Sequence, residues 1–166
     1  MSEEIPIEKL LKKENIKILD TVSDWQEAIK IVIQPLVEQG YCEKRYIDGI
    51  IANTYTYGPY YVLCENLALI HASSDKGVID TQLSIVVLKN PVRFKKDGFD
   101  VRILIGLTAI DSNAHISAMR AISNIFVDNK RINKIINALT TAQIYDEFIE
   151  AWFINKALMK GEVVWN

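Results

Sequence analysis

The chain contains only two histidines, and each follows a stretch that has the pattern of a β-strand. His71 ends the largely apolar run 66–70, and His115 comes after the apolar run 101–110 and a short polar turn. Ligands and reacting groups collect at the carboxyl ends of strands in open α/β folds. An imidazole exchanges protons near neutral pH and can accept a phosphoryl group as a nucleophile. The two histidines are therefore the leading candidates for chemistry.

The surroundings of His115 favour an anion. His115 lies in the expected first turn of a helix that Ser112 or Asn113 would cap. Free backbone N–H groups and the positive end of the helix dipole would stabilise a phosphoryl group on a nearby imidazole. From residue types alone, a structural role as a partly buried residue that ends a strand explains His71 somewhat better than chemistry does. For His115, a solvated residue of a first turn is an equally good explanation.

Other catalytic signatures are absent from the sequence. It has no glycine-rich phosphate loop, no HExxH pair, no CxxC pair and no serine-hydrolase elbow. Cys42 and Cys64 form no framework of disulfides or metal ligands, and packing explains them best. Asp111 is a candidate for orienting an imidazole, although a carboxylate at a strand end is more often solvated or part of a helix cap.

Composition limits the classes of protein to which the chain can belong. Its 166 residues suit one domain with a sizeable core, so we expect a single domain over 1–166. A net charge of −2 gives no basic surface for nucleic acid. No apolar run approaches the roughly 20 residues of a bilayer span, and the acidic start lacks the pattern of a signal peptide. We expect a cytoplasmic protein without direct membrane insertion.

Helical patterns occupy the first part of the chain. The spacing of Ser23 and Gln26 is that of a capping box, which predicts a helix that opens at Ser23. Pro35 removes a backbone donor, so we expect a kink or an early end there, with Gly40 beyond the helix. A second helix is expected from about Glu43.

Strand patterns fill the middle of the chain. The short apolar runs 60–64 and 67–70 predict a hairpin whose turn contains Asn66, since asparagine tolerates a positive φ. The runs 81–89 and 101–110 are nearly continuous in apolar residues, which suits strands that are covered on both faces. Four tyrosines cluster around Gly58-Pro59: Tyr55, Tyr57, Tyr60 and Tyr61. Packing with exposed hydroxyls explains them better than a sugar-binding platform does.

Helical spacing returns after Asn113, from about Lys130 and from about Thr141. Helices thus flank a strand-rich centre at both ends of the chain. This order predicts an α/β domain in which helices cover both faces of a mixed β-sheet. The last residues, 161–166, are expected to form either a loose tail or a short strand.

The order of these features resembles one protein family. A strand that ends in His71 is followed by an apolar strand over 83–88, by Asn-Pro-Val at 90–92 and by Asp-x-x-x-His at 111–115. This set resembles the enzyme IIA domains of the mannitol/fructose type from the bacterial phosphoenolpyruvate-dependent sugar phosphotransferase system. The resemblance covers about 16–150, and the stretch 56–62 is most similar to the ascorbate-specific members.

The resemblance implies a phosphoryl-carrier mechanism that needs no cofactor and no metal. The residue matched by His71 accepts a phosphoryl group from the phosphocarrier protein HPr and passes it to an enzyme IIB. Enzyme IIB then phosphorylates the sugar as the membrane enzyme IIC transports it. The residue matched by His115 lies beside the first histidine and holds the phosphoryl oxygens. We expect Ser73, Asn113 and Ala114 to supply further phosphate-binding groups.

Two other hypotheses remain open from the sequence. Ile70 and Ser73 stand where members of this family usually carry proline and arginine, which motivates a non-catalytic regulatory module that binds a partner protein according to phosphorylation. A hydrolase or metal enzyme that uses both histidines is the weaker alternative, because no cysteines or clustered acids complete a metal set. The carrier hypothesis requires both rings to meet in an exposed hollow.

Overall fold

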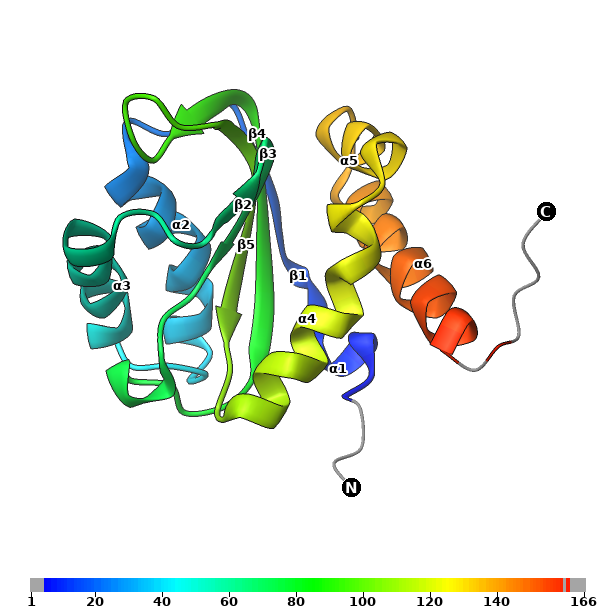
Figure 1. Cartoon of the computed structure of the whole chain (residues 1–166), viewed down its shortest axis with the longest axis horizontal. Coiled ribbons are helices and arrows are strands. Elements are labelled where there is room, and N and C mark those ends of the chain that lie inside the picture. Colours follow the sequence, from blue (N-terminus) through cyan, green and yellow to red (C-terminus); the bar gives the residue numbers. More distant parts are fainter. Residues whose placement is uncertain (1–4, 160, 162–166) are drawn as a thin grey trace.

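A five-stranded mixed sheet lies between two layers of helices in the computed structural model, which describes residues 5–159 and residue 161 (Figure 1). The strand order is β1-β4-β5-β3-β2. Strands β1 and β4 run parallel, as do β3 and β5, whereas β4 with β5 and β2 with β3 are antiparallel. The predicted mixed sheet is therefore confirmed. The strands are β1 (Leu11–Leu19), β2 (Val62–Cys64), β3 (Asn66–Ile70), β4 (Gln82–Arg93) and β5 (Asp100–Thr108).

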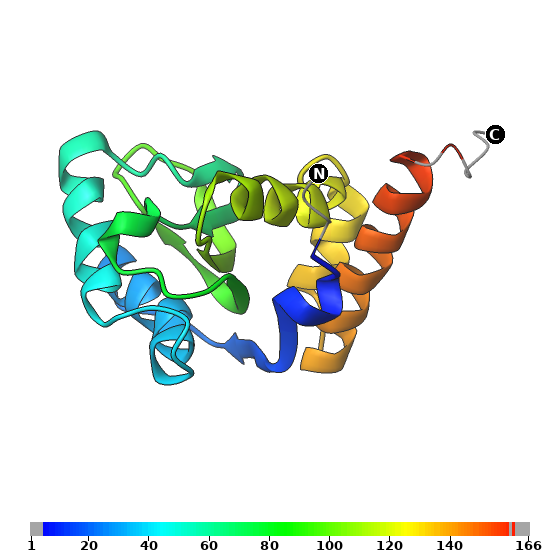
Figure 2. The same ribbon diagram turned by 90° about the horizontal axis from the view of Figure 1, so that it is seen from below.

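Helices cover both faces of this sheet, as the sequence predicts (Figures 1 and 2). No helix in the described ranges is long and apolar enough to cross a bilayer. The sequence predicts a tail or a short strand over 161–166. Apart from Gly161, this segment lies outside the described residues. One face carries α2 (Trp25–Glu38) and α3 (Arg45–Tyr57), and the other carries α1 (Ile7–Leu10), α4 (Ser112–Phe126), α5 (Asn129–Ile136) and α6 (Thr141–Met159); a short 3-10 helix, η1 (Ser74–Lys76), follows β3.

The alternation of side chains along the strands builds two separate cores. In β3, Leu67 and Leu69 pack in the core beneath α4, α5 and α6, while Ala68 and Ile70 pack in the core beneath α2 and α3. All four side chains are fully buried, which explains why the strand appears in the sequence as a continuous apolar run. His71 comes two residues after Leu69, so the same alternation directs it toward the α4 face.

Helix α2 begins one residue later than predicted and does not end at Pro35, while Gly40 lies beyond the helix as expected. Asp24, rather than Ser23, is the N-cap, and its carboxylate accepts a hydrogen bond from the backbone N–H of Glu27 at 2.8 Å. Ser23 instead donates through its backbone N–H and its hydroxyl to the Glu27 carboxylate. The helix also continues through Pro35 to Glu38. Pro35 is buried, and we attribute the continuation to packing that offsets the missing backbone donor.

The sequence analysis misses strand β1 and the short helix α1 before it, since it places the first element at Ser23. The charged run 12–14 interrupts the alternation of buried and exposed residues in β1. The pairing with β4 shifts register between Leu11 and Ile16, which marks a β-bulge or a similar irregularity. Charged residues and bulges are typical of edge strands, where they discourage pairing with another chain. They also remove the regular pattern that identifies a strand.

Asn66 occupies the tight turn between β2 and β3 with a φ of +72°. It is the single non-glycine residue with a positive φ among those that the structure describes. The predicted hairpin and its conformation at Asn66 are therefore confirmed. Because β3 leads directly to His71, this turn helps to fix where the chain leaves the sheet at the candidate site.

We expect Asn66→Ala to lower the free energy of unfolding by about 1 kcal/mol, because alanine is disfavoured in the left-handed region. Asn66→Gly should stay within a few tenths of a kcal/mol of the wild type, since glycine adopts this φ freely but gains entropy in the unfolded chain. Denaturant unfolding of both variants measures the two values. An alanine variant as stable as the glycine variant would contradict a local requirement for positive φ.

Candidate active site

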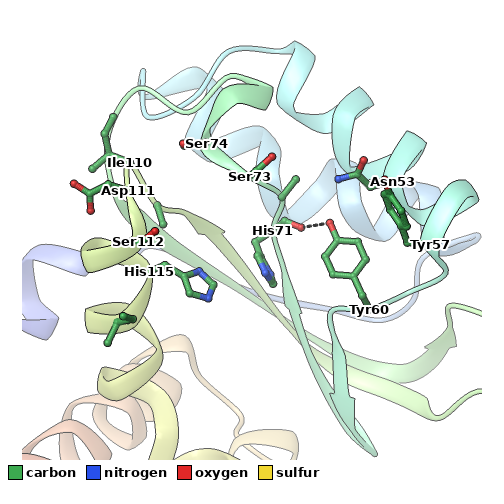
Figure 3. A pocket seen from close by; sticks show the side chains of 13 residues that line it. Asn53, Tyr57, Tyr60, His71, Ser73, Ser74, Ile110, Asp111, Ser112 and His115 are labelled. Atoms are coloured by element: carbon green, nitrogen blue, oxygen red, sulfur yellow. Dashed lines mark hydrogen bonds between the residues drawn. The ribbon is translucent and has the colours of Figure 1, made fainter.

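The rings of His71 and His115 meet at the edge of the sheet where β3 and β5 end (Figure 3). His71 directly follows β3, and His115 lies near the start of α4, the next helix after β5. The ring centroids are 5.1 Å apart and the ring planes are tilted by 45°. Both side chains are partly exposed. The two histidines come together because β3 and β5 are neighbouring parallel strands that end at the same edge.

The two rings line an open hollow of about 840 Å³. Neither lysine nor arginine occurs among the described residues that line it, so an anion there would meet hydroxyl, amide and imidazole groups and the carboxylate of Asp111. Three segments supply the rest of the lining: α3 and the loop after it (Asn53, Tyr57, Tyr60), the segment after β3 (Ala72, Ser73, Ser74), and the segment from the end of β5 into α4 (Ala109, Ile110, Asp111, Ser112, Ile116).

A backbone hydrogen bond fixes the tautomer of His71. Its Nδ1 lies 2.6 Å from the carbonyl oxygen of Leu69. A carbonyl oxygen can only accept a hydrogen bond, so Nδ1 must carry the hydrogen. In the neutral ring, Nε2 therefore keeps its lone pair. Nε2 is the atom of His71 that can act as a nucleophile.

The surroundings of His71 favour its neutral form. Partial burial lowers the pKa of His71, because it removes water from around the charged ring. The hydrogen bond to the Leu69 carbonyl opposes this effect by stabilising the protonated ring, and the nearby charge of His115 lowers the pKa further. The net direction is downward, so His71 is predominantly neutral at pH 7.

The start of α4 differs from the sequence-based prediction. Asp111, rather than Ser112 or Asn113, caps the helix, and its carboxylate accepts a hydrogen bond from the backbone N–H of Ala114 at 2.8 Å. That N–H group is therefore already occupied. The aspartate can cap the helix because its extended backbone places the carboxylate over the first turn.

The position of this cap decides which residues face the histidine pair. Ser112 and His115 are three residues apart and share one face of α4, which lines the hollow. Asn113 and Ala114 lie on another face and line a separate hollow with Ser117. The structure thus does not bring Asn113 and Ala114 to the histidine pair as predicted. We replace them with Ser112 in the candidate set.

Ser73 lies in the lining, as expected, but its hydroxyl is already engaged. It donates a hydrogen bond to the carboxylate of Asp75. This bond is the main reason that the pKa of Asp75 lies below its ordinary value. Because a serine hydroxyl has one proton, Ser73 must turn away from Asp75 before it can donate to a phosphoryl oxygen.

Tyr60 is a residue of this site that the sequence analysis misses. Its hydroxyl donates to the backbone carbonyl oxygen of His71 at 2.5 Å, and its ring packs edge-on against the imidazole with centroids 5.7 Å apart (Figure 3). Asn53, which lies in the same lining, is a further polar group near Tyr60. The local sequence around Tyr60 does show a cluster of tyrosines, but no local pattern indicates that this loop lies against residue 71.

The donor set is poorly suited to a catalytic metal. In the part of the chain that the structure describes, no three histidine, cysteine, aspartate or glutamate side chains come together as potential ligands. Catalytic zinc sites usually have three protein ligands, whereas this site offers two imidazoles, and the Leu69 carbonyl occupies Nδ1 of one of them. The arrangement is better suited to nucleophilic chemistry on His71.

Comparison with known families agrees with this geometry. Residues 9–151 match the family model described as "Phosphoenolpyruvate-dependent sugar phosphotransferase system, EIIA 2". The chain therefore belongs to this family of enzyme IIA components, which are phosphotransferases that carry phosphate between proteins. The resemblance inferred from the sequence over 16–150 is confirmed.

Individual relatives differ in the sugar that their names specify. The ascorbate-specific PTS system EIIA component of Escherichia coli is 33% identical over 141 residues, which are 84% of this chain and 92% of that protein. The solution structure of the mannitol-specific cryptic phosphotransferase enzyme IIA CmtB from Escherichia coli has a TM-score of 0.78 and 29% identity, and the match covers 85% of this chain and 95% of that one. The predicted α/β fold is therefore confirmed.

A complex of mannitol enzyme IIA with phosphorylated enzyme IIB from Escherichia coli shares the fold. Its match has a TM-score of 0.73 and 23% identity, and covers 84% of this chain and 97% of that one.

We expect NMR titration to give a pKa for His71 below the ordinary value of about 6.5, because its ring is partly buried. In His115→Gln the pKa of His71 should rise, since a neighbouring charge is removed, but remain below the ordinary value because the burial persists. Tyr55→Phe, an exposed change outside the hollow, is the control and should leave the titration unchanged. A pKa at or above the ordinary value in the wild type would contradict the described surroundings of His71.

Proposed function

We propose that His71 accepts a phosphoryl group from the phosphohistidine of HPr and passes it to an enzyme IIB. The observation that carries the proposal is the pairing of His71 with His115 at an open hollow, with Nδ1 of His71 bonded to the Leu69 carbonyl. Membership of the enzyme IIA family supports HPr as the donor. The fold shared with an enzyme IIA in complex with enzyme IIB supports the acceptor.

The proposed transfer requires no proton to leave the attacking atom. The lone pair on Nε2 of His71 forms a bond to phosphorus, while the bond between phosphorus and the donor's imidazole nitrogen breaks and its electron pair returns to the donor ring. Nδ1 keeps its hydrogen, and the Leu69 carbonyl stabilises the positive charge that the ring acquires. Transfer to enzyme IIB reverses these bond changes. Such reactions depend mainly on positioning and on stabilisation of charge.

We propose that His115 is the main group that stabilises the transferred phosphoryl group. In its imidazolium form, it is the one cationic side chain available in the described lining of the hollow. Its place near the start of α4 adds the positive end of the helix dipole. The hydroxyls of Ser73 and Ser112 are further donors within the same lining. Donors that are already in place when charge develops contribute most to such catalysis.

The openness of the site suits a carrier that meets two proteins in turn. Neither imidazole is sealed beneath packed side chains. Apolar side chains at the rim remain exposed, with Tyr57 at 73%, Ile116 at 47% and Ile110 at 43%. Exposed apolar and aromatic side chains around a small site are typical of transient protein contacts. These features support a docking surface that HPr and enzyme IIB would use alternately.

The transported sugar is proposed to be of the ascorbate type. The stretch 56–62, which is similar to ascorbate-specific members, includes Tyr57 and Tyr60 in the lining of the hollow. A relative with the ascorbate-specific name supports the same choice. The proposed role places the protein in the cytoplasm, where it acts indirectly with a membrane enzyme IIC.

Incubation with phosphoenolpyruvate, enzyme I and HPr should label the wild type with an acid-labile phosphate on His71, and His71→Gln should take up none. His71→Gln should retain its circular dichroism spectrum and melt cooperatively, because the side chain lies at the edge of the core. The labelled protein should pass its phosphate faster to an enzyme IIB of the ascorbate type than to one of the mannitol type. A wild type that stays unlabelled while a control enzyme IIA is labelled would rule out the proposal.

His115→Ala should still accept phosphate, because Nε2 of His71 remains intact. Loss of one charge-stabilising donor should slow onward transfer to enzyme IIB on the order of tenfold to hundredfold. Stopped-flow or rapid-quench measurement of phosphate transfer gives this rate, with Tyr55→Phe as an unaffected control. An unchanged rate in His115→Ala would remove His115 from the mechanism and leave its proximity to His71 without a role.

A further inference from the structure

We infer that Tyr46 and Tyr60 together hold the peptide bond between His71 and Ala72 and thereby aim the His71 ring. The two tyrosines are positioning residues, since they contact the backbone beside the acceptor rather than the reacting atoms. This inference rests on the proposed function only in taking His71 as the acceptor. The two residues are called the tyrosine clamp below.

Tyr60 holds the oxygen side of this peptide bond. Its hydroxyl donates to the carbonyl oxygen of His71 at 2.5 Å (Figure 3). The ring of Tyr60 packs edge-on against the imidazole of His71 and, on another side, against Tyr61. The residue follows the end of α3, where Gly58 adopts a positive φ and turns the chain toward the hollow. Tyr60 is partly exposed, so its hydroxyl is close to solvent.

Tyr46 holds the nitrogen side of the same peptide bond. The backbone N–H of Ala72 donates to the Tyr46 hydroxyl at 2.9 Å, and this hydroxyl lies 2.8 Å from the carbonyl oxygen of Leu107, to which it can donate. The Tyr46 side chain is fully buried. Burial raises the pKa of Tyr46, so the hydroxyl keeps its proton throughout the physiological range.

The Tyr46 hydroxyl also joins the two segments that carry the histidines. The register of β3 with β5 ends with Ile70 opposite Gly106. Beyond this pair, the Tyr46 hydroxyl bridges Ala72 to Leu107, in place of a direct hydrogen bond between the strands. The chain after β3 is thereby attached to β5, which leads to α4 and His115. Tyr46 thus helps to set the spacing between the two halves of the site.

Two hydrogen bonds on one peptide plane fix its rotation. The oxygen and the N–H of a trans peptide point in opposite directions, so partners on both sides prevent the plane from turning. Rotation about the Cα–C bond of His71 would change the direction of its side chain relative to the Leu69 carbonyl and to His115. The clamp therefore acts on the geometry that keeps Nε2 available. Both of its members come from α3 or from the loop that follows α3.

Tyr60→Phe and Tyr46→Phe test this inference, because each removes one hydroxyl and keeps the ring. Tyr61→Phe is the matched control for the buried residue, since Tyr61 is also fully buried and its hydroxyl bonds to Thr54 instead. Tyr55→Phe is the matched control for Tyr60, since it is exposed and its hydroxyl bonds to Gln26. The readouts are the tautomer of His71 in the unphosphorylated protein, by ¹⁵N NMR, and the rate of phosphoryl acceptance at saturating HPr.

We expect each clamp variant to lower the acceptance rate by about threefold to tenfold, which is the effect of one hydrogen bond. Each should also raise the population of the tautomer with the hydrogen on Nε2. The double variant should be slowed by less than the product of the two single effects, because both hydroxyls act on one peptide plane. Both controls should keep the wild-type rate and tautomer, even where Tyr61→Phe lowers the melting temperature.

Clamp variants that match their controls in both tautomer and rate would overturn the inference. If Tyr46→Phe does not fold, Tyr60→Phe decides the question alone, because Tyr60 lies at the surface of the hollow. A wild type that accepts no phosphate would end the proposed function. The tautomer measurement would still test the clamp in that case, since it uses the unphosphorylated protein.

Discussion

The parallel pairing of β3 with β5 is the constraint on which the candidate site depends. Both strands end at the same edge of the sheet, so the chain after one delivers His71 and the chain after the other delivers His115. Leu69 pairs with Ile105 in this register, and its side chain faces the α4 layer. A slip of one residue would turn His71 toward the opposite layer, where Ile70 now packs against α2 and α3. The apolar alternation that builds the two cores therefore also chooses the face on which the imidazole lies.

The same site combines two electrostatic features that suit a carrier. Partial burial keeps His71 predominantly neutral, and the Leu69 carbonyl holds the hydrogen on Nδ1, so the lone pair lies on Nε2. The described lining supplies imidazole, hydroxyl and side-chain amide groups together with the carboxylate of Asp111, but no lysine or arginine. A very strong anion site would hold the phosphoryl group more tightly in the carrier than during transfer, which would slow its release. Moderate stabilisation by His115 is compatible with acceptance from one protein and delivery to another.

The sequence predicts those parts of the structure that local patterns encode. The apolar runs identify β3, β4 and β5, and the polar turn before His115 identifies a helix start. The cap of α4 lies at Asp111, one or two residues earlier than the expected Ser112 or Asn113, and each residue of shift turns the helix by about 100°. That small error places Asn113 and Ala114 on the wrong face of α4. Tyr46 and Tyr60 escape prediction for a different reason: their partners at His71, Ala72 and Leu107 are distant in the sequence, and no periodicity connects them.

The tyrosine clamp also bears on Ile70, which precedes the proposed acceptor at the position where the family resemblance leads us to expect a proline. A proline restricts its own backbone φ and that of the preceding residue, and so stiffens the approach to the histidine. Here Ile70 is instead a fully buried residue of β3, paired with Gly106 and packed in the core beneath α2 and α3. The restraint comes after the histidine rather than before it, through hydroxyls on both sides of the 71–72 peptide bond. A relative that never accepts a phosphoryl group would have no need for this restraint, because docking to a partner does not depend on the tautomer of one imidazole. The geometry around Nε2 thus supports phosphoryl acceptance by His71, on which both the proposed carrier and a regulatory phospho-acceptor module depend.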